Sequence, residues 1–407
     1  MNNTPLGNRL HISIFGRRNA GKSTLINALT NQDIAVVSDI PGTTTDPVYK
    51  TMELLPIGPV VIIDTAGFDD IGDLGNLRVE KTLDILRKTD LAIIVLNSQE
   101  VLSEFDREFV NRIKEKGIPA IAVLNKCDIA DISDQDLNYF RDTLNIPAIK
   151  ISAEKKTGIE ELKKNIARYA KTDEGQLSIV GDMIKPGDFV VLVTPIDKAA
   201  PKGRLILPQQ QTIRDIIESD AIAVVTKEHE LKETIKNLGK KPALVITDSQ
   251  AFLKVSADTP EDIPLTSFSI LFARFKGELT EMVRGLKRIE QLDAGSRVLV
   301  VEGCTHHRQA DDIGKVKIPR WVRQIAGGDI EFEWASGTYF PKEIDKYDLI
   351  IHCGGCMLNK QEMQYRINFA KDHNVSITNY GMLIAHVQGI LNRALKPFPL
   401  ASMILEE

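Results

Sequence analysis

The stretch GRRNAGKS, residues 16–23, decides the fold that this sequence predicts. It matches the pattern of a phosphate-binding loop, whose backbone N–H groups surround the phosphates at the N-terminus of the next helix. An apolar run, LHISIF at 10–15, precedes the loop, and TLINAL at 24–29 has the spacing of a helix. We therefore expect strand, loop and helix, with Lys22 on the β- and γ-phosphates and Ser23 on Mg²⁺.

Short apolar runs alternate with amphipathic stretches on both sides of this loop and as far as residue 170. VVIID at 60–64, LAIIVLN at 91–97 and PAIAVLN at 119–125 indicate buried strands. EFDREFVNRIKEK at 104–116 and GIEELKKNIARYA at 158–170 indicate helices. This alternation is typical of an α/β protein with a mostly parallel sheet.

The rest of the chain predicts two smaller parallel-sheet α/β domains. A polar stretch at 171–187 is interpreted as a linker or as the entry segment of the next domain. An acidic, Pro-bearing stretch at 256–267 is interpreted as a boundary, and an apolar stripe over 268–289 as one long helix. The expected strands are 189–196, 221–227 and 242–247, then 297–303, 347–353 and 375–381. The predicted domains are 1–172, which carries the phosphate loop, 185–260 and 266–407.

Three further motifs follow the phosphate loop in the order of a GTP-binding protein. DTAG at 64–67 ends a strand, so that Asp64 can hold the metal while the Gly67 N–H faces the terminal phosphate. NKCD at 125–128 ends another strand, and the Asp128 carboxylate can accept both the N1 and N2 hydrogens of guanine. SAEKKTG at 152–158 supplies backbone over the base. Together the motifs predict GTP rather than ATP as the ligand.

These motifs resemble those of the translation-factor-related GTPases of the tRNA-modification and ribosome-assembly type. PGTTTD at 41–46 is similar to their first switch, which implies that Thr44 ligates Mg²⁺, and Asn19 matches the asparagine that helps to hold K⁺. Phe68 stands where Ras-like enzymes carry a water-orienting Gln, and Gly75 falls near the catalytic acid of the tRNA-modifying relative. Slow, switch-like hydrolysis is implied, with Lys22, Thr44, Asp64 and Gly67 catalytic. The nucleotide-binding set is Gly16, Asn19, Ala20, Gly21, Lys22, Ser23, Thr24, Thr44, Asp64, Gly67, Asn125, Lys126, Asp128, Ser152 and Ala153.

Composition limits the classes of partner. The net charge of -5 argues against a broad nucleic-acid surface, which needs concentrated Lys and Arg. No apolar run approaches the roughly 18 residues of a membrane span. The first residues, MNNTPLGNRL, show no export signal, so a cytoplasmic location is expected. In that reducing compartment, paired cysteines more often bind metal or act in redox chemistry than form structural disulfides.

Three of the four cysteines lie in the last quarter of the chain and form the second candidate site. Cys304 follows one expected strand and Cys353 and Cys356 follow another, so in one parallel sheet they would meet at the same edge. His306 and His352 flank them, each as a candidate ligand or second-shell donor. A Cys₃His zinc site and a C-x-x-C dithiol remain open, but an iron–sulfur cluster accounts for all three thiols.

The combination of both sites resembles the HydF family, the FeFe-hydrogenase maturation GTPases, over the whole chain. The resemblance implies a dimer formed by the middle domain and a 4Fe-4S cluster held by Cys304, Cys353 and Cys356. It also implies a scaffold that receives a two-iron precursor from two radical-SAM hydrogenase maturases and delivers it to apo-FeFe-hydrogenase. Its expected ligands are GTP or GDP, Mg²⁺ and K⁺.

Two other functions are consistent with parts of the sequence. One is a ribosome- or RNA-associated regulatory GTPase with a structural zinc domain, which would need a basic face. The other is a nucleotide-gated thiol oxidoreductase, which would need a low pKa at Cys353 or Cys356 and no role for Cys304.

Overall fold

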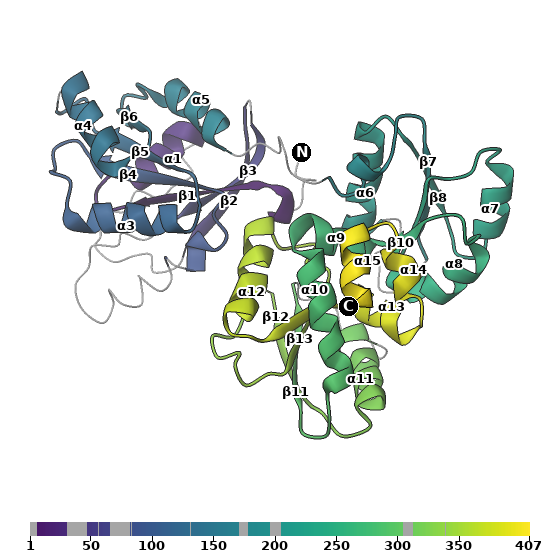
Figure 1. Cartoon of the computed structure of the whole chain (residues 1–407). Coiled ribbons are helices and arrows are strands. Elements are labelled where there is room, and N and C mark those ends of the chain that lie inside the picture. The colour runs from purple at the N-terminus through teal and green to yellow at the C-terminus, as the bar shows by residue number, and fades with distance from the viewer. Residues whose placement is uncertain are drawn as a thin grey trace. The chain divides into compact units, whose positions relative to one another are not determined.

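The computed structural model describes residues 6–30, 47–55, 57–65, 82, 84–130, 132–170, 178–195, 205–303, 312–337 and 339–407. The chain forms two compact units, Met1–Gly175 and Gln176–Glu407 (Figure 1). Among the described residues, no helix is long and apolar enough to cross a membrane.

The first unit is built on one six-stranded sheet in the order β2-β3-β1-β4-β5-β6. All neighbouring strands are parallel except β2, which pairs antiparallel with β3 at the edge. The strands are β1 Leu10–Gly16, β2 Val48–Leu54, β3 Gly58–Asp64, β4 Leu91–Asn97, β5 Ala120–Asn125 and β6 Ala148–Lys150. The expected mostly parallel α/β sheet is confirmed.

Helices cover both faces of this sheet, which explains why its central strands are apolar runs without alternation. Residues of α1 (Lys22–Thr30) and α5 (Ile159–Tyr169) share one apolar cluster, and those of α3 (Glu104–Glu115) and α4 (Asp134–Leu144) share the other. Along β4, successive side chains alternate between the two clusters, as the pleat of a strand requires. Ser103 and Ser133 begin α3 and α4 with capping boxes.

The second unit contains two four-stranded sheets in which every neighbouring pair is parallel. The first has the order β10-β9-β7-β8, with β7 Phe189–Val193, β8 Ile222–Thr226, β9 Leu244–Thr247 and β10 Leu265–Ser267. The second has the order β12-β11-β13-β14, with β11 Arg297–Glu302, β12 Glu331–Ser336, β13 Leu349–His352 and β14 Ser376–Asn379. Of these strands, β10 and β12 were not expected from the sequence.

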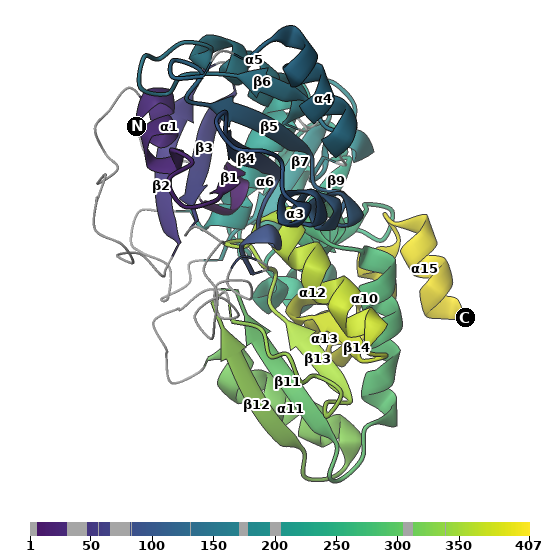
Figure 2. The same ribbon diagram turned by 90° about the vertical axis from the view of Figure 1, so that its left-hand side faces the viewer.

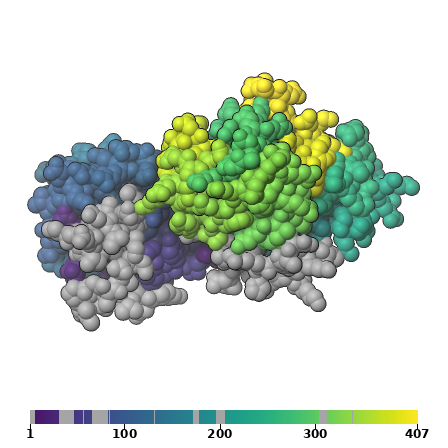
Figure 3. Space-filling model, turned by 90° about the horizontal axis from the view of Figure 1, so that it is seen from below, coloured from purple at the N-terminus to yellow at the C-terminus, as the bar shows by residue number. Residues whose placement is uncertain are grey.

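One continuous apolar core connects the two sheets of this unit, and a separate apolar cluster, which includes Leu231 of the helix at 231–237, contains the alternate side chains of β7. Helices surround both sheets. They are α6 Leu207–Glu218, α7 Leu231–Asn237, α8 Phe252–Asp258, α9 Phe268–Lys276, α10 Leu279–Leu286, α11 Ile318–Ala326, α12 Lys360–Asp372, α13 Tyr380–Val387, α14 Leu391–Leu395 and α15 Pro399–Glu406. Figure 2 shows α10 and α12 beside the second sheet, and Figure 3 shows the yellow C-terminal helices next to green α10. The boundaries 1–172, 185–260 and 266–407 stay predictions.

The long helix expected over 268–289 is instead two helices, α9 and α10, which break at Gly277. Gly277 has extended backbone (φ -121°, ψ -144°), so the helix cannot continue through it. A Cβ at this position would lie 2.8 Å from Ile367 Cδ1 and 2.9 Å from the Ala273 carbonyl oxygen. The apolar stripe could not reveal the break because both helices present apolar faces to the same core.

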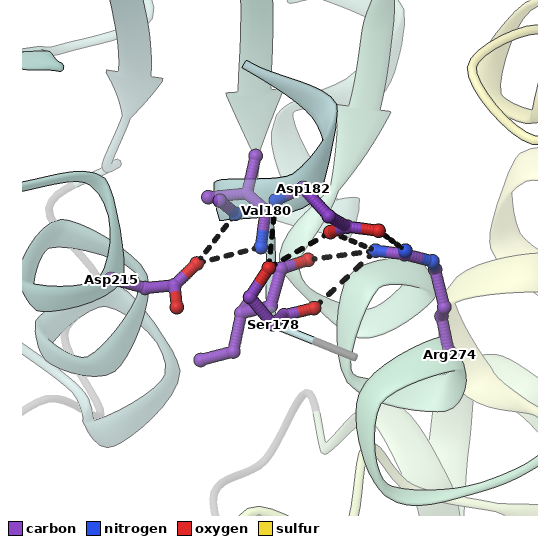
Figure 4. Close-up of polar contacts among 7 residues, drawn as sticks. Ser178, Val180, Asp182, Asp215 and Arg274 are labelled. Atoms are coloured by element: carbon purple, nitrogen blue, oxygen red, sulfur yellow. Dashed lines mark hydrogen bonds and ion pairs between the residues drawn. The ribbon is translucent and has the colours of Figure 1, made fainter. Parts of the chain in front are cut away.

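The stretch interpreted as a linker is folded onto the second unit from residue 178 onward. Ile179 and Val180 are buried, and the Asp215 carboxylate accepts hydrogen bonds of 2.8 Å from the N–H groups of Val180 and Gly181 (Figure 4). Arg274, on α9, donates to the Ser178 carbonyl at 3.4 Å and forms an ion pair with Asp182. Residues from 178 onward are therefore not a free linker but an entry segment of the second unit, held through backbone groups and the Asp182 carboxylate.

Candidate functional site

The phosphate loop joins β1 to α1, as the sequence predicts. Gly21 has a φ of +90°, and a Cβ there would lie 2.2 Å from Asn125 Nδ2, so a side chain would be both strained and blocked. Asn19 has a φ of +59°, a conformation that asparagine tolerates better than most residues. The Lys22 Nζ donates to the carbonyl oxygens of Gly16 at 2.9 Å and Arg17 at 2.8 Å, which places the cation over the loop.

Two predicted magnesium residues meet beside this loop. The Ser23 Oγ, in the first turn of α1 with Thr24, donates to Asp64 Oδ2 at 3.4 Å. The other carboxylate oxygen, Asp64 Oδ1, is buried and has no hydrogen-bond partner among the described residues. Burial raises the pKa of Asp64, and Lys22 opposes that rise. A hard cation with oxygen ligands fits this pair, because it would satisfy the orphaned oxygen and favour the ionised carboxylate.

The guanine motifs are fastened to the phosphate loop by one buried side chain. The Asn125 Nδ2 donates to the Ala20 carbonyl at 3.0 Å, and the Asn125 Oδ1 accepts from the Ala153 N–H at 3.0 Å. The Ser152 Oγ donates to Asp128 Oδ1 at 2.6 Å, and this hydrogen bond lowers the pKa of Asp128. The carboxylate that would accept from guanine is therefore ionised at neutral pH. Lys126, which follows Asn125 in the same motif, adopts a φ of +68°.

The structure thus brings together most of the nucleotide residues expected from the sequence. Gly16, Asn19, Ala20, Gly21, Lys22, Ser23 and Thr24 lie in one loop and helix start, which Asn125 links to Ala153. Thr44 and Gly67 lie outside the described residues, and so do Phe68 and Gly75. Their predicted roles stay predictions.

The second site lies at the carboxyl ends of β11 and β13, which pair in parallel as expected. The Cys353 Sγ accepts hydrogen bonds from the Gly303 N–H at 3.0 Å and the Gly355 N–H at 3.4 Å. Gly355 has a φ of +61°, which makes the tight turn before Cys356. Gly303 directly precedes Cys304, so the chain carrying the third cysteine leaves β11 beside Cys353. Cys304 and His306 themselves lie outside the described residues.

The two N–H groups that donate to the Cys353 sulfur fit a cluster held by thiolates, since hydrogen bonds to cysteine sulfur help to set the reduction potential of such clusters. Burial raises the pKa of the Cys353 thiol to about 11, and the N–H groups of Gly303 and Gly355 partly offset that rise. A coordinated metal would deprotonate such a thiol. In the part of the chain that the structure describes, no group of three His, Cys, Asp or Glu side chains could hold a metal ion.

His352 is held by the protein through both ring nitrogens. Its Nε2 lies 3.0 Å from Arg366 Nη1 and must accept from that guanidinium, so its Nδ1–H donates to the Cys353 carbonyl at 2.7 Å. Burial and Arg366 lower the pKa of His352 to about 3, which keeps the ring neutral. A ligand role would break one of these bonds. The geometry favours the alternative in which His352 orients the Cys353 backbone.

Two buried cations beside this turn were missed by the sequence reasoning. Arg366, on α12, also donates to Glu362 Oε1 at 2.9 Å and to the Gly337 carbonyl at 3.0 Å. Lys276, in the last turn of α9, donates to the carbonyl oxygens of the turn itself. The only sequence signal is a basic residue within an apolar helical stripe, which usually indicates a solvated edge rather than a site.

Family models match three successive parts of the chain. Residues 11–126 match "50S ribosome-binding GTPase", residues 179–277 match "Hydrogen maturase F dimerization domain", and residues 280–397 match "Hydrogen maturase F tetramerization domain". The first match, with the nucleotide geometry, makes the chain a GTPase whose cofactors are GTP or GDP and Mg²⁺. The other two show that it carries oligomerisation domains.

Curated relatives match part of the chain. The tRNA modification GTPase MnmE of Heliobacterium modesticaldum is 37% identical over 164 residues, which is 40% of this chain and 34% of the relative. MnmE of Thermotoga maritima is 38% identical over 172 residues, 42% of this chain and 37% of the relative. The chain thus spans about a third of the length of these relatives.

Solved structures also match part of the chain. An Era variant of Aquifex aeolicus bound to GDP and aluminium fluoride gives a TM-score of 0.37 at 20% identity, covering 56% of this chain and 98% of that one. The FeoB G-domain of Methanococcus jannaschii gives 0.33 at 26% identity, covering 40% and 99%. The matches that identify one family are those of the second unit. Two models of the same maturase cover residues 179–277 and 280–397, and both follow the GTPase domain in the sequence. The chain belongs to the hydrogen maturase F family.

Proposed function

We propose that this GTPase is an iron–sulfur scaffold that carries the two-iron precursor of the FeFe-hydrogenase active site and delivers it to the apo-hydrogenase. The observation that carries the proposal is the Cys353 sulfur, which accepts the Gly303 N–H at 3.0 Å and so lies beside the residue that precedes Cys304 in the sequence. Cys356 follows across the Gly355 turn. Three thiols would then face one centre at the edge of one parallel sheet.

A 4Fe-4S cluster held by Cys304, Cys353 and Cys356 would supply one iron whose fourth ligand is exchangeable, a suitable point for attaching a cargo. The residues of this chain would hold that centre and shield it. The Gly303 and Gly355 N–H groups donate to sulfur, and Lys276 and Arg366 place positive charge nearby. His306 stays a candidate ligand, whereas His352 is better suited to fix the turn.

The nucleotide site would act as a switch for this cargo. We assign Lys22 to the β- and γ-phosphates and Ser23, Thr44 and Asp64 to Mg²⁺, with the Gly67 N–H at the terminal phosphate. Support comes from Lys22 Nζ over the loop and from the unpaired Asp64 Oδ1. Asn19, in its left-handed conformation, is proposed to help to hold K⁺ beside the phosphates.

The partners would be a second copy of this chain, the two radical-SAM maturases and the apo-hydrogenase. A homodimer is supported by β8, an edge strand of the first sheet in the second unit. Its Ile222 and Val225 side chains are 43% and 45% exposed, and an apolar edge strand favours pairing with another strand. Neither a membrane nor a nucleic acid is required by these features.

The deciding experiment is the iron, sulfide and zinc content of the protein purified without oxygen, with its visible and EPR spectra. Iron and sulfide in equal amounts, about four of each per chain, are expected for one 4Fe-4S cluster. One zinc per chain, with no cluster after reconstitution, would instead support a ribosome- or RNA-associated GTPase with a structural zinc domain. That second candidate draws on the match of residues 11–126 to a 50S ribosome-binding GTPase model.

A further inference from the structure

Lys276 is one of the most deeply buried charged residues in the part of the chain that the structure describes. Lys276 is the last residue of helix α9 and is 2% exposed. Lysine is almost never fully buried unless its ammonium group is paired, so the contacts of this side chain need a reason.

All the described hydrogen bonds of this ammonium group go to the turn that carries Cys356. The Lys276 Nζ lies 2.7 Å from the Leu358 carbonyl oxygen, 2.9 Å from that of Cys356 and 3.4 Å from that of Gly355. An ammonium group has three donors, so this one turn can use all of them. Carbonyl dipoles that point at one place repel each other, and a cation at that place holds them together.

The helix and the turn belong to different parts of the chain. Lys276 lies at the end of the segment that matches the dimerization model, 179–277, whereas the turn lies within the tetramerization match, 280–397. Eighty residues separate Lys276 from Cys356. The side chain therefore ties the cysteine turn to a helix that the C-x-x-C motif does not include.

We propose that Lys276 is a positioning residue for the cluster site: it fixes the turn at residues 353–358 through three carbonyls and supplies a positive charge beside the thiolates. The proposal rests on the cluster assignment above for its second half only. A fixed turn keeps both sulfurs directed at one centre, and a nearby cation offsets the negative charge of the cysteine sulfurs and of a reduced cluster.

The first test uses the iron-free protein and measures amide hydrogen exchange by mass spectrometry. In Lys276→Met, peptides covering 353–360 should exchange faster than in the unsubstituted chain, because the turn loses its hydrogen-bond donor. Arg274→Met is the matched control: Arg274 lies in the same helical turn but donates to Ser178, Ile179 and Asp182. It should speed exchange at 178–183 and leave 353–360 unchanged.

The second test uses the reconstituted protein and measures iron loss to a chelator and the midpoint potential of the cluster. Lys276→Met should lose iron about 10- to 100-fold faster, the usual scale for loss of a supporting residue, and its potential should become more negative. Lys276→Gln retains amide donors without the charge. It should restore most of the protection of 353–360 but keep the lowered potential.

The outcomes separate this inference from the proposed function. Unchanged exchange at 353–360 and unchanged iron loss in Lys276→Met would overturn the positioning role, even with a cluster present. If the unsubstituted chain bound no cluster, the scaffold proposal would fail, and the exchange experiment would still decide whether Lys276 fixes the turn. If Lys276→Met did not fold, Lys276→Gln would take its place, and a midpoint potential equal to that of the unsubstituted chain would count against the proposal.

Discussion

The nucleotide site and the cysteine turn obtain their shape from different sources. In the nucleotide site the motif residues bond to one another: Asn125 holds the loop at Ala20 and the backbone at Ala153, and Ser152 holds Asp128. In the cysteine turn the support comes from outside the motif, from Lys276 on α9 and Arg366 on α12. A motif that supports itself can be recognised from spacing alone, whereas one supported by distant cations cannot.

The largest expected effect is on the cysteine site. Cys353→Ser should abolish cluster binding, because the alkoxide that would replace the thiolate is a poor ligand for this iron centre, while GTP hydrolysis should be unchanged. Iron content and phosphate release on the same preparation measure both properties. Cys127→Ser is the control, since Cys127 lies in the first unit with its Sγ 3.2 Å from the Leu124 carbonyl. Loss of both properties in a folded Cys353→Ser protein would show that the two sites are not separable.

The reciprocal change is Lys22→Ala in the phosphate loop. It removes the cation that lies over the Gly16 and Arg17 carbonyls, so GTP hydrolysis should fall by about 10²- to 10³-fold, the scale for loss of one transition-state donor. Iron content should not change. Steady-state phosphate release with saturating Mg²⁺ checks the first claim, and a hydrolysis rate within threefold of the unsubstituted chain would refute the assignment of Lys22.

Arg366→Met tests how much the buried Arg366 guanidinium, which bonds to His352 next to the cysteine turn, contributes to the stability of the second unit. It leaves the Glu362 carboxylate, 3% exposed, without its cation and should lower the free energy of unfolding of the second unit by about 3–5 kcal/mol. Both tryptophans, Trp321 and Trp334, lie in that unit, so fluorescence in denaturant reports its unfolding. Arg214→Met is the control, because it breaks an exposed pair with Glu218 and should cost less than about 1 kcal/mol.

Asp128→Asn should weaken the preference for guanine by about 10- to 100-fold, since one charged hydrogen-bond partner of the base is lost. Asparagine offers one acceptor and one donor, a pattern that suits xanthine, so the variant should gain affinity for xanthosine nucleotides. Competition between GDP and XDP measures the change. Asp134→Asn, on the exposed side of the same unit, should leave the preference as it is.

The smallest expected effect is that of the monovalent cation. Replacing K⁺ by Na⁺ at constant ionic strength should slow GTP hydrolysis if Asn19 helps to hold K⁺, and it should not alter iron content. Equal rates in the two salts would remove the potassium assignment and leave the other nucleotide residues unaffected.

The sequence was sufficient for the α/β class of the first unit and for four of its six strands, β1, β3, β4 and β5, but not for β2 and β6. It also predicted the two strands that precede the cysteines. Apolar runs such as 91–97 are buried on both faces, and a parallel sheet then follows from the helices between them. β12 was missed because its Glu331–Ser336 sequence is largely exposed at an edge and lacks an apolar run. The break at Gly277 was missed because close contact with Ile367 belongs to tertiary packing.

For the candidate sites, the nucleotide residues could be named because each motif is short and adjacent to a strand. Lys276 and Arg366 could not be named from the sequence. The Cys356 carbonyl that Lys276 contacts lies 80 residues away, and the His352 that Arg366 contacts lies at the end of β13. Only part of the role of Asn125 could be predicted from the sequence. Its position in NKCD predicts contact with the nucleotide, but its bonds to Ala20 and Ala153 depend on the fold.

Asn125 also links the thermodynamics of the two halves of the nucleotide. Its amide, 2% exposed, uses one end for the loop that would hold phosphates and the other for the backbone that would cover the base. Ordering either loop therefore restrains the other through a single side chain. Guanosine and pyrophosphate should bind as separate fragments with positive cooperativity, and each should raise the affinity of the other by the same factor.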